Sequence, residues 1–518
     1  MKNEKVTTIV PGMRKLEFAG LFLLCLGSSG LAQNASYNIS HYDLLIETFF
    51  ATKEIGVTAT VYIRNPGLQN TFTFGLNDRY AAVNVTSDSS SVMVQRANRA
   101  VTVTASRATK ELALLFRLRG KLGRSDDEDR EIMTDSSLFL LWSDRFYPID
   151  FDQWSTVRTE LLLPQDFQAI APGKQVMGET SGDNMHIVFE TQTPTTMVSV
   201  IADSRWIRTR RMVNGIKMQT LLYPESQRFA DQILRTSTEI LRFFSSMYCP
   251  YPFDQYSFVT VGDIFARRAF PGFVGYEPHY LEKEFSSTGH DAHETSLLWW
   301  GYTTHGSGPG SFQWTEGLGD YAEILYDEQF KKPVPKNFEK FRNEYLLLPP
   351  AQDVPYADLK GDTPQKIIHG KYPWLMHVLR YVVGDSAFNK AMKLVFQRYQ
   401  FRTFSMAQFV STLEKATGQS LKWWRDEWIG RRGVPEIAMR SRVQKTSSGY
   451  HVTCTLEQRG SIYHIPLEIG IESLDGARIE RVNLVDQQMT FQFDMQEEPL
   501  GVKLDPRGWL LARIRSLE

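Results

Sequence analysis

The chain has 518 residues, which is too many for one hydrophobic core and predicts about three compact domains. Hydrophobic residues make up 42% and charged residues 23% of the sequence, as in ordinary folded proteins. The formal net charge of -1 argues against the basic surface that nucleic-acid binding requires, so we expect no nucleic acid among the partners.

The N-terminus has the pattern of an export signal. Arg14 and Lys15 precede an apolar run over 18–26, and small residues follow up to Ala32. The run is far shorter than the roughly 20 residues that span a bilayer. We therefore expect residues 1–32 to be a cleaved signal peptide. The mature protein is then periplasmic or secreted, with no membrane span.

Residues 33–203 predict a β domain. Hydrophobic residues alternate with other residues over 55–64, and similar short runs recur up to about residue 203. The charged stretch 123–131 predicts a solvated loop within this domain.

Residues 204–432 predict a mainly helical domain. Apolar residues recur three and four positions apart over 226–247 and 386–400, as on one face of a helix. Ser405 and Gln408 form the pattern of a capping box ahead of a further helix.

Pro373 suits the first turn of a helix, because its missing N–H would have no partner there. We therefore expect a helix to begin close to Pro373, with His369 just before its N-terminus. Strand alternation returns over 433–518 and predicts a small C-terminal β domain. The whole chain is thus expected to be a multidomain α+β protein.

The stretch HDAHETSLLWWG, residues 290–301, is nearly a zinc-protease helix. Such a helix holds zinc with two histidines four residues apart, since these lie on one face, and a second helix adds a carboxylate. His293 and Glu294 fit the motif, and Glu316 begins a second apolar-periodic run. Leu297 stands where the second histidine is needed.

The spacing of His293, Glu294 and Glu316 resembles that of the aminopeptidase N family of gluzincin zinc metallopeptidases, with one histidine of the HExxH motif replaced. Three further stretches are similar to motifs of the family: 248–281, 366–392 and 404–437. The resemblance covers about 200–440. It implies a β saddle domain over 33–203, a thermolysin-like gluzincin domain over 204–432 and a β-sandwich over 433–518.

The resemblance also implies a chemistry for individual residues. Zinc would be held by His293 and Glu316, and Glu294 would be the general base of peptide hydrolysis. Glu277 would bind the free amine of the substrate, and Gly275 would be a substrate-binding residue in the glycine place of the same motif. An alternative pairs Glu277 with Arg267 or Arg268. His369 holds the place of the tyrosine that stabilises the oxyanion.

Two chemically necessary residues have therefore changed together, at 297 and 369. Leu297 extends an apolar helix face, which leaves two protein ligands where catalytic zinc has three. The resemblance implies zinc as the cofactor, but we expect the affinity for zinc to be strongly reduced. We expect an aminopeptidase-like protein that binds peptide or protein N-termini and whose hydrolytic activity is lost or impaired. The alternative is an active zinc aminopeptidase in which His369 joins His293 and Glu316 as a ligand. His290 fits less well, because it would move the metal about 5 Å along the helix.

Overall fold

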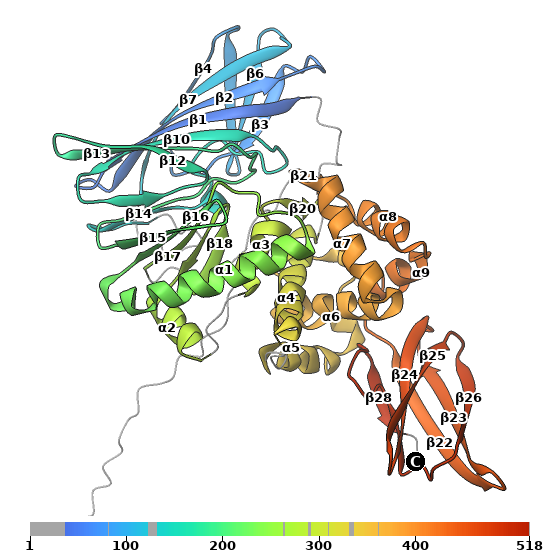
Figure 1. Cartoon of the computed structure of the whole chain (residues 1–518). Helices are drawn as coiled ribbons and strands as arrows, with labels where there is room; N and C mark the ends of the chain where they lie inside the picture. Colours follow the sequence, from blue (N-terminus) through green and yellow to red (C-terminus); the bar gives the residue numbers. More distant parts are fainter. Residues whose placement is uncertain are drawn as a thin grey trace, which may run out of the picture.

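The computed structural model describes residues 37–80, 82–122, 132–262, 265–287, 292–308, 310–330, 336–360 and 362–516. The predicted signal peptide, the charged stretch 123–131 and His290 lie outside the described residues. Within them, a β region, a mainly helical region and a second β region follow one another along the chain (Figure 1).

The N-terminal region is built from three sheets. A seven-stranded sheet has the order β12 (Lys174–Ser181), β13 (Asn184–Glu190), β10 (Thr156–Pro164), β1 (Asn38–Phe49), β2 (Glu54–Arg64), β7 (Glu111–Lys121), β4 (Ala82–Ser87). A four-stranded sheet has the order β11 (Gln168–Ile170), β14 (Val200–Asp203), β9 (Ser137–Leu140), β8 (Ile132–Met133). A three-stranded sheet has the order β3 (Thr71–Gly75), β6 (Ala100–Ala105), β5 (Val92–Ala97). Alternate residues of β2 are buried, as its sequence pattern predicts.

The first part of the middle region is a sheet that the helical prediction missed. Its order is β15 (Ile207–Val213), β16 (Ile216–Leu222), β17 (Gln255–Thr260), β19 (Phe273–Tyr276), β18 (Arg267–Phe270). Helix α1 (Ala230–Met247) connects the parallel strands β16 and β17. Asn214 and Gly215 both have positive φ and form the β15–β16 turn, a pairing that is a hairpin signal in the sequence. Strand β17 is buried throughout and shows no alternation.

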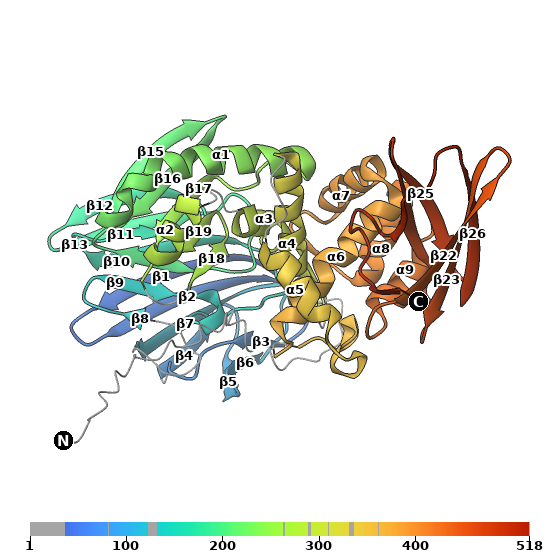
Figure 2. The same cartoon turned by 90° about the horizontal axis from the view of Figure 1, so that it is seen from below.

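Helices form the rest of the middle region. They are α2 (Pro278–Ser287), α3 (Ala292–Trp300), α4 (Ser311–Gln329), α5 (Lys336–Leu346), α6 (Gln365–Val383), α7 (Asp385–Tyr399), α8 (Met406–Thr417) and α9 (Lys422–Trp424). A short parallel pair, β20 (Thr304–Gly306) with β21 (Arg402–Phe404), lies among them. Helix α4 packs against both α3 and α6 (Figure 2). None of the helices described is both long and apolar enough to cross a membrane.

Helix α6 corrects one prediction and α8 confirms another. Helix α6 begins at Gln365, so Pro373 lies inside it and His369 lies in its second turn. The expected start near Pro373 was wrong, because a proline removes one backbone hydrogen bond but packing on α4 and α5 keeps the helix continuous. Helix α8 has the predicted capping box, with Ser405 and Gln408 bonded reciprocally.

The C-terminal region pairs two sheets as a sandwich. One has the order β26 (Gln488–Met495), β23 (Gly449–Arg459), β22 (Glu436–Thr446), β28 (Arg513–Ser516), and the other the order β25 (Gly476–Leu484), β24 (Ile465–Ser473), β27 (Gly501–Leu504). Its buried side chains belong to the same hydrophobic core as those of the helices. Cys249 and Cys454 are both free thiols.

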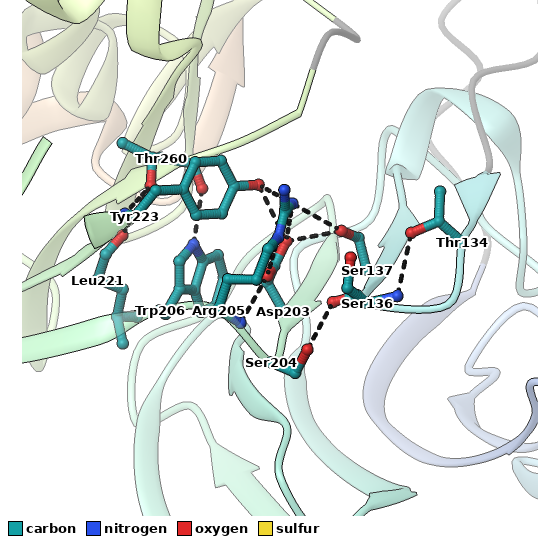
Figure 3. A network of polar contacts seen from close by, with 10 residues as sticks. All are labelled: Thr134, Ser136, Ser137, Asp203, Ser204, Arg205, Trp206, Leu221, Tyr223 and Thr260. Atoms are coloured by element: carbon teal, nitrogen blue, oxygen red, sulfur yellow. Dashed lines mark hydrogen bonds and ion pairs between the residues drawn. The ribbon is translucent and has the colours of Figure 1, made fainter. Parts of the chain in front are cut away.

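Buried polar networks fix the joints between regions. Asp203, at the end of β14, accepts hydrogen bonds from Ser137 Oγ (2.6 Å) and Tyr223 OH (2.9 Å) and pairs with Arg205 (Figure 3). Trp206 Nε1 donates to the Thr260 carbonyl of β17 at 2.8 Å. The four-stranded sheet is thereby tied to the five-stranded sheet.

A second network joins α6 to the C-terminal region. Asp353 Oδ2 accepts hydrogen bonds from Lys371 Nζ (2.7 Å), Tyr345 OH (3.0 Å) and the backbone N–H of Gly433 (2.6 Å). Lys371 and Asp353 are both fully buried, so each charge depends on the other.

Candidate active site

The two predicted zinc ligands, His293 and Glu316, contact each other between α3 and α4. Every residue of α3 is buried, including His293 and Glu294. His293 Nε2 lies 3.4 Å from Glu316 Oε2, the carboxylate on α4. The spacing that suggested a shared site in the sequence therefore corresponds to a contact.

Asp320 holds the other side of the His293 ring. It follows Glu316 by one helical turn and so shares its face of α4. Its Oδ1 lies 2.9 Å from His293 Nδ1. The contact is ionic rather than a well-aligned hydrogen bond, since the buried Nδ1 finds no partner of good geometry. Asp320 leaves Nε2 directed at Glu316, as a carboxylate behind a metal-binding histidine does.

His369 extends the cluster to α6. Its Nδ1 lies 2.6 Å from Asp320 Oδ2 and its Nε2 lies 2.6 Å from Gln365 Oε1. Polar contacts thus run from Gln365 through His369, Asp320 and His293 to Glu316, joining α6, α4 and α3. Both nitrogens of His369 are engaged.

The charges in this cluster are mutually dependent. Burial lowers the pKa of His293, but the carboxylates of Asp320, Glu316 and Glu294 outweigh burial and raise it well above its ordinary value. Burial raises the pKa of Asp320, but His369 and His293 outweigh it and lower that pKa to about 2. Asp320 is therefore ionised at neutral pH.

Leu297 lies one turn after His293 on α3, at the position where the predicted motif needs a second histidine. It is 7% exposed and packs against Gly319 on α4. A β-carbon on Gly319 would lie 2.8 Å from Leu297 Cδ2 and 3.2 Å from His293 Cε1. The two helices approach closely at this point because residue 319 has no side chain.

The donor set does not complete a zinc site. His293 Nε2 and Glu316 converge, but Asp320 contacts the opposite ring nitrogen and Leu297 supplies no donor. In the residues that the structure describes, no group of three His, Cys, Asp or Glu side chains is arranged to hold a metal ion. A catalytic zinc site needs three protein ligands around one point.

Glu294, the predicted general base, faces a cation. Its Oε1 lies 3.5 Å from Nε of Arg267, on β18 at the edge of the five-stranded sheet. Strand β18 packs on α3. Arg267, one of the two partners that the alternative gave to Glu277, therefore forms an ion pair with Glu294.

Gly275 lies on β19 and Glu277 directly follows this strand, which contacts α3. A β-carbon on Gly275 would lie 3.2 Å from Val261 and 3.3 Å from Phe265, side chains of the N-terminal core. The next residue, Tyr276, stacks on Phe258 on the opposite face of the sheet.

Glu277 follows β19 at the start of α2, and its backbone N–H donates to the Ala266 carbonyl at 3.1 Å. The roles predicted for Gly275 and Glu277 stay predictions.

Two residues that organise the cluster were missed as site residues: Asp320 and Gln365. Each lies four positions from a predicted site residue on the same helix, Asp320 after Glu316 and Gln365 before His369. This spacing was the available signal.

Comparison with known proteins supports an aminopeptidase-like fold. No family model matches the chain. It is 30% identical over 124 residues to aminopeptidase N of Lactococcus lactis subsp. lactis, covering 23% of this chain and 14% of that protein. It is 21% identical over 143 residues to aminopeptidase N of Haemophilus influenzae, covering 24% and 16%.

A solved structure, Legionella pneumophila aminopeptidase A in complex with aspartic acid, matches 93% of this chain with a TM-score of 0.75 and 12% identity. The match covers 60% of that protein's chain. The chain thus has the fold of an aminopeptidase, and its matches span only part of each of these proteins.

Proposed function

We propose that the protein is a relative of gluzincin aminopeptidases that binds peptide or protein N-termini without zinc-dependent hydrolysis. The single observation that carries this proposal is Leu297, packed on Gly319 where the second histidine ligand would stand. Without this ligand, His293 and Glu316 are two donors for a metal that normally takes three from the protein.

The state of Glu294 supports the same proposal. A general base must reach the proton it removes. Glu294 Oε1 instead lies 3.5 Å from Nε of Arg267, in an ion pair. The side chain of Glu316 is 19% exposed, so it is the charged group of this cluster that a peptide terminus would contact.

The alternative is an active zinc aminopeptidase that uses His293, Glu316 and His369. The position of His369 favours this alternative, because the Asp320 carboxylate contacts both His369 and His293. To serve as a ligand, His369 would have to release Asp320 or Gln365, and both contacts are 2.6 Å long.

Metal content and hydrolysis separate these two functions. We expect the purified protein to carry far less than one zinc per chain and to leave aminoacyl arylamides intact, with or without added zinc. Stoichiometric zinc together with turnover that disappears in Glu294→Gln would overturn the binding function. Absence of both would overturn the alternative.

Peptide binding is tested with fluorescent peptides that have either a free or an acetylated N-terminus. We expect the free amine to bind more tightly, and Glu277→Gln to remove the difference if Glu277 holds the amine. Equal binding of the two peptides would contradict recognition of N-termini. Export of the protein, proposed from the basic and apolar pattern of residues 1–32, is tested by fractionation of cells and N-terminal sequencing of the mature chain.

A further inference from the structure

A pocket of about 620 Å³ lies on the helical region, away from the cluster around His293. It is bounded by α1, the C-terminal end of α4 and α7, and its lining includes Gln329. At 1.5 Å per residue, Gln329 stands about 20 Å along α4 from Glu316. The volume falls within the roughly 300–1,000 Å³ typical of small-molecule sites.

Cations dominate the charged lining. Arg235, Arg242 and Lys393 line the pocket, against one carboxylate, Glu239. Arg235 and Arg242 lie two turns apart on α1, and Lys393 lines the same pocket from α7. In the part of the chain that the structure describes, none of the three cations makes an ion pair. An anion that binds among them is attracted by all three charges.

The one carboxylate is already engaged. Tyr326 on α4 donates its hydroxyl proton to Glu239 in a hydrogen bond, and this carboxylate raises the pKa of Tyr326 in addition to burial. Glu239 is therefore held toward Tyr326. An incoming anion meets the guanidinium groups, which match the oxygens of a phosphate or carboxylate in pairs.

Aromatic rings form an apolar wall beside the cations. The Phe243 ring lies 5.5 Å from Tyr326 and 6.4 Å from Phe330, and Tyr326 lies 4.7 Å from Phe330. Phe330 lines the pocket and is 39% exposed. A ring on the ligand can stack on this wall while its anionic group reaches the cations.

We propose that this pocket binds a small anion that carries an aromatic ring, an aryl phosphate or aryl carboxylate. The charge of the ligand is matched by Arg235, Arg242 and Lys393, and its ring by Phe243 and Phe330. The site is independent of zinc and of the cluster around His293.

Titration calorimetry of the full chain with phenyl phosphate tests the proposal, with inorganic phosphate as the probe that lacks the ring. We expect Arg242→Gln and Lys393→Gln each to lower the affinity for phenyl phosphate by about tenfold or more, since each removes a charge-assisted contact. Lys390→Gln is the matched control, because Lys390 is an exposed cation of α7 outside the pocket lining. Phe330→Ala should bring the affinity for phenyl phosphate down to that for inorganic phosphate.

Two results would overturn the site. One is absence of phenyl phosphate binding to the unchanged protein. The other is an equal effect of Lys390→Gln and Lys393→Gln, which would mean a diffuse charge effect. Equal affinity for phenyl phosphate and inorganic phosphate in the unchanged protein would overturn the aromatic part of the proposal. Circular dichroism of each variant checks that the fold is kept.

Discussion

The side chain of Leu297 lies directly over Gly319, so that a β-carbon at residue 319 would come within 2.8 Å of Leu297 Cδ2. The position at which the predicted motif needs a second histidine therefore lies where α3 and α4 are in close contact. His293 and Glu316 already converge next to it. The proposed loss of zinc binding therefore rests on one side chain, that of Leu297.

Leu297→His is expected to restore zinc binding. The new imidazole would stand one turn after His293 on the same face and complete three protein ligands. We expect zinc affinity to rise by at least about a hundredfold. Even loss of a residue that only hydrogen-bonds to a metal ligand lowers metal affinity by about 10–100-fold. Zinc titration and zinc per chain after dialysis measure the change. Leu297→Asn is the matched polar control, and adding Glu316→Gln to Leu297→His should abolish the gain. If Leu297→His binds no more zinc than Leu297→Asn, the remaining ligands are not positioned as described.

Part of the site could be predicted from the sequence because helical spacing is local. His293, Glu294 and Glu316 lie on two helices whose periods are visible in the sequence, and the structure brings His293 and Glu316 together. The capping box of Ser405 and Gln408 was predictable for the same reason. The capping box depends on residues within one turn of each other. The contact of His293 with Glu316 joins two helices and was expected from the resemblance in spacing.

The rest depends on tertiary contacts that one sequence does not display. Helix α6 runs through Pro373 because α4 and α5 pack along it. Arg267 reaches Glu294 only because β18 lies at the edge of the sheet beside α3. The helical period predicted after residue 204 overlooked the β15–β16 hairpin, although Asn214 and Gly215 were a signal for it.

Gly317→Ala is expected to destabilise the contact of α4 with α6. A β-carbon there would lie 2.4 Å from Tyr372 Cβ, and a Cβ cannot move without its backbone. We expect the free energy of unfolding to fall by about 1–3 kcal/mol, measured by urea denaturation. Gly319→Ala is the matched control, because its β-carbon would contact Cδ2 of Leu297, a side-chain end that can move without the backbone. An equal or larger loss for Gly319→Ala would contradict this account of the two helix contacts.

Lys371→Met is expected to lower the free energy of unfolding far more than removal of a surface lysine does. It leaves the Asp353 carboxylate buried with hydrogen bonds from Tyr345 and Gly433 but without its cation. Breaking such a pair costs about 3–5 kcal/mol. Lys340→Met removes an exposed partner of Glu344 and should cost less than about 1 kcal/mol. Similar urea midpoints for the two variants would show that the buried pair contributes little.

His377 is expected to make the fold sensitive to acid. Its ring stacks on Trp509 of the C-terminal region, with centroids 4.1 Å apart and planes at 10°. Burial, together with Arg380 and Arg342, lowers the pKa of His377 from 6.5 to about 3. Between these two pH values the unfolded chain holds more protons than the folded chain, so stability falls as pH falls through this window.

The expected loss from this one residue is about 2 kcal/mol between pH 7 and pH 5, at about 1.4 kcal/mol per pH unit below 6.5. His377→Phe keeps an aromatic ring against Trp509 and removes the titration. The difference in unfolding free energy between His377→Phe and the unchanged protein should therefore shift by this amount in favour of the variant at pH 5. Urea denaturation of both proteins at pH 5, 6 and 7 measures it. A difference that stays constant with pH would mean that His377 accepts a proton in the folded protein as readily as in the unfolded chain.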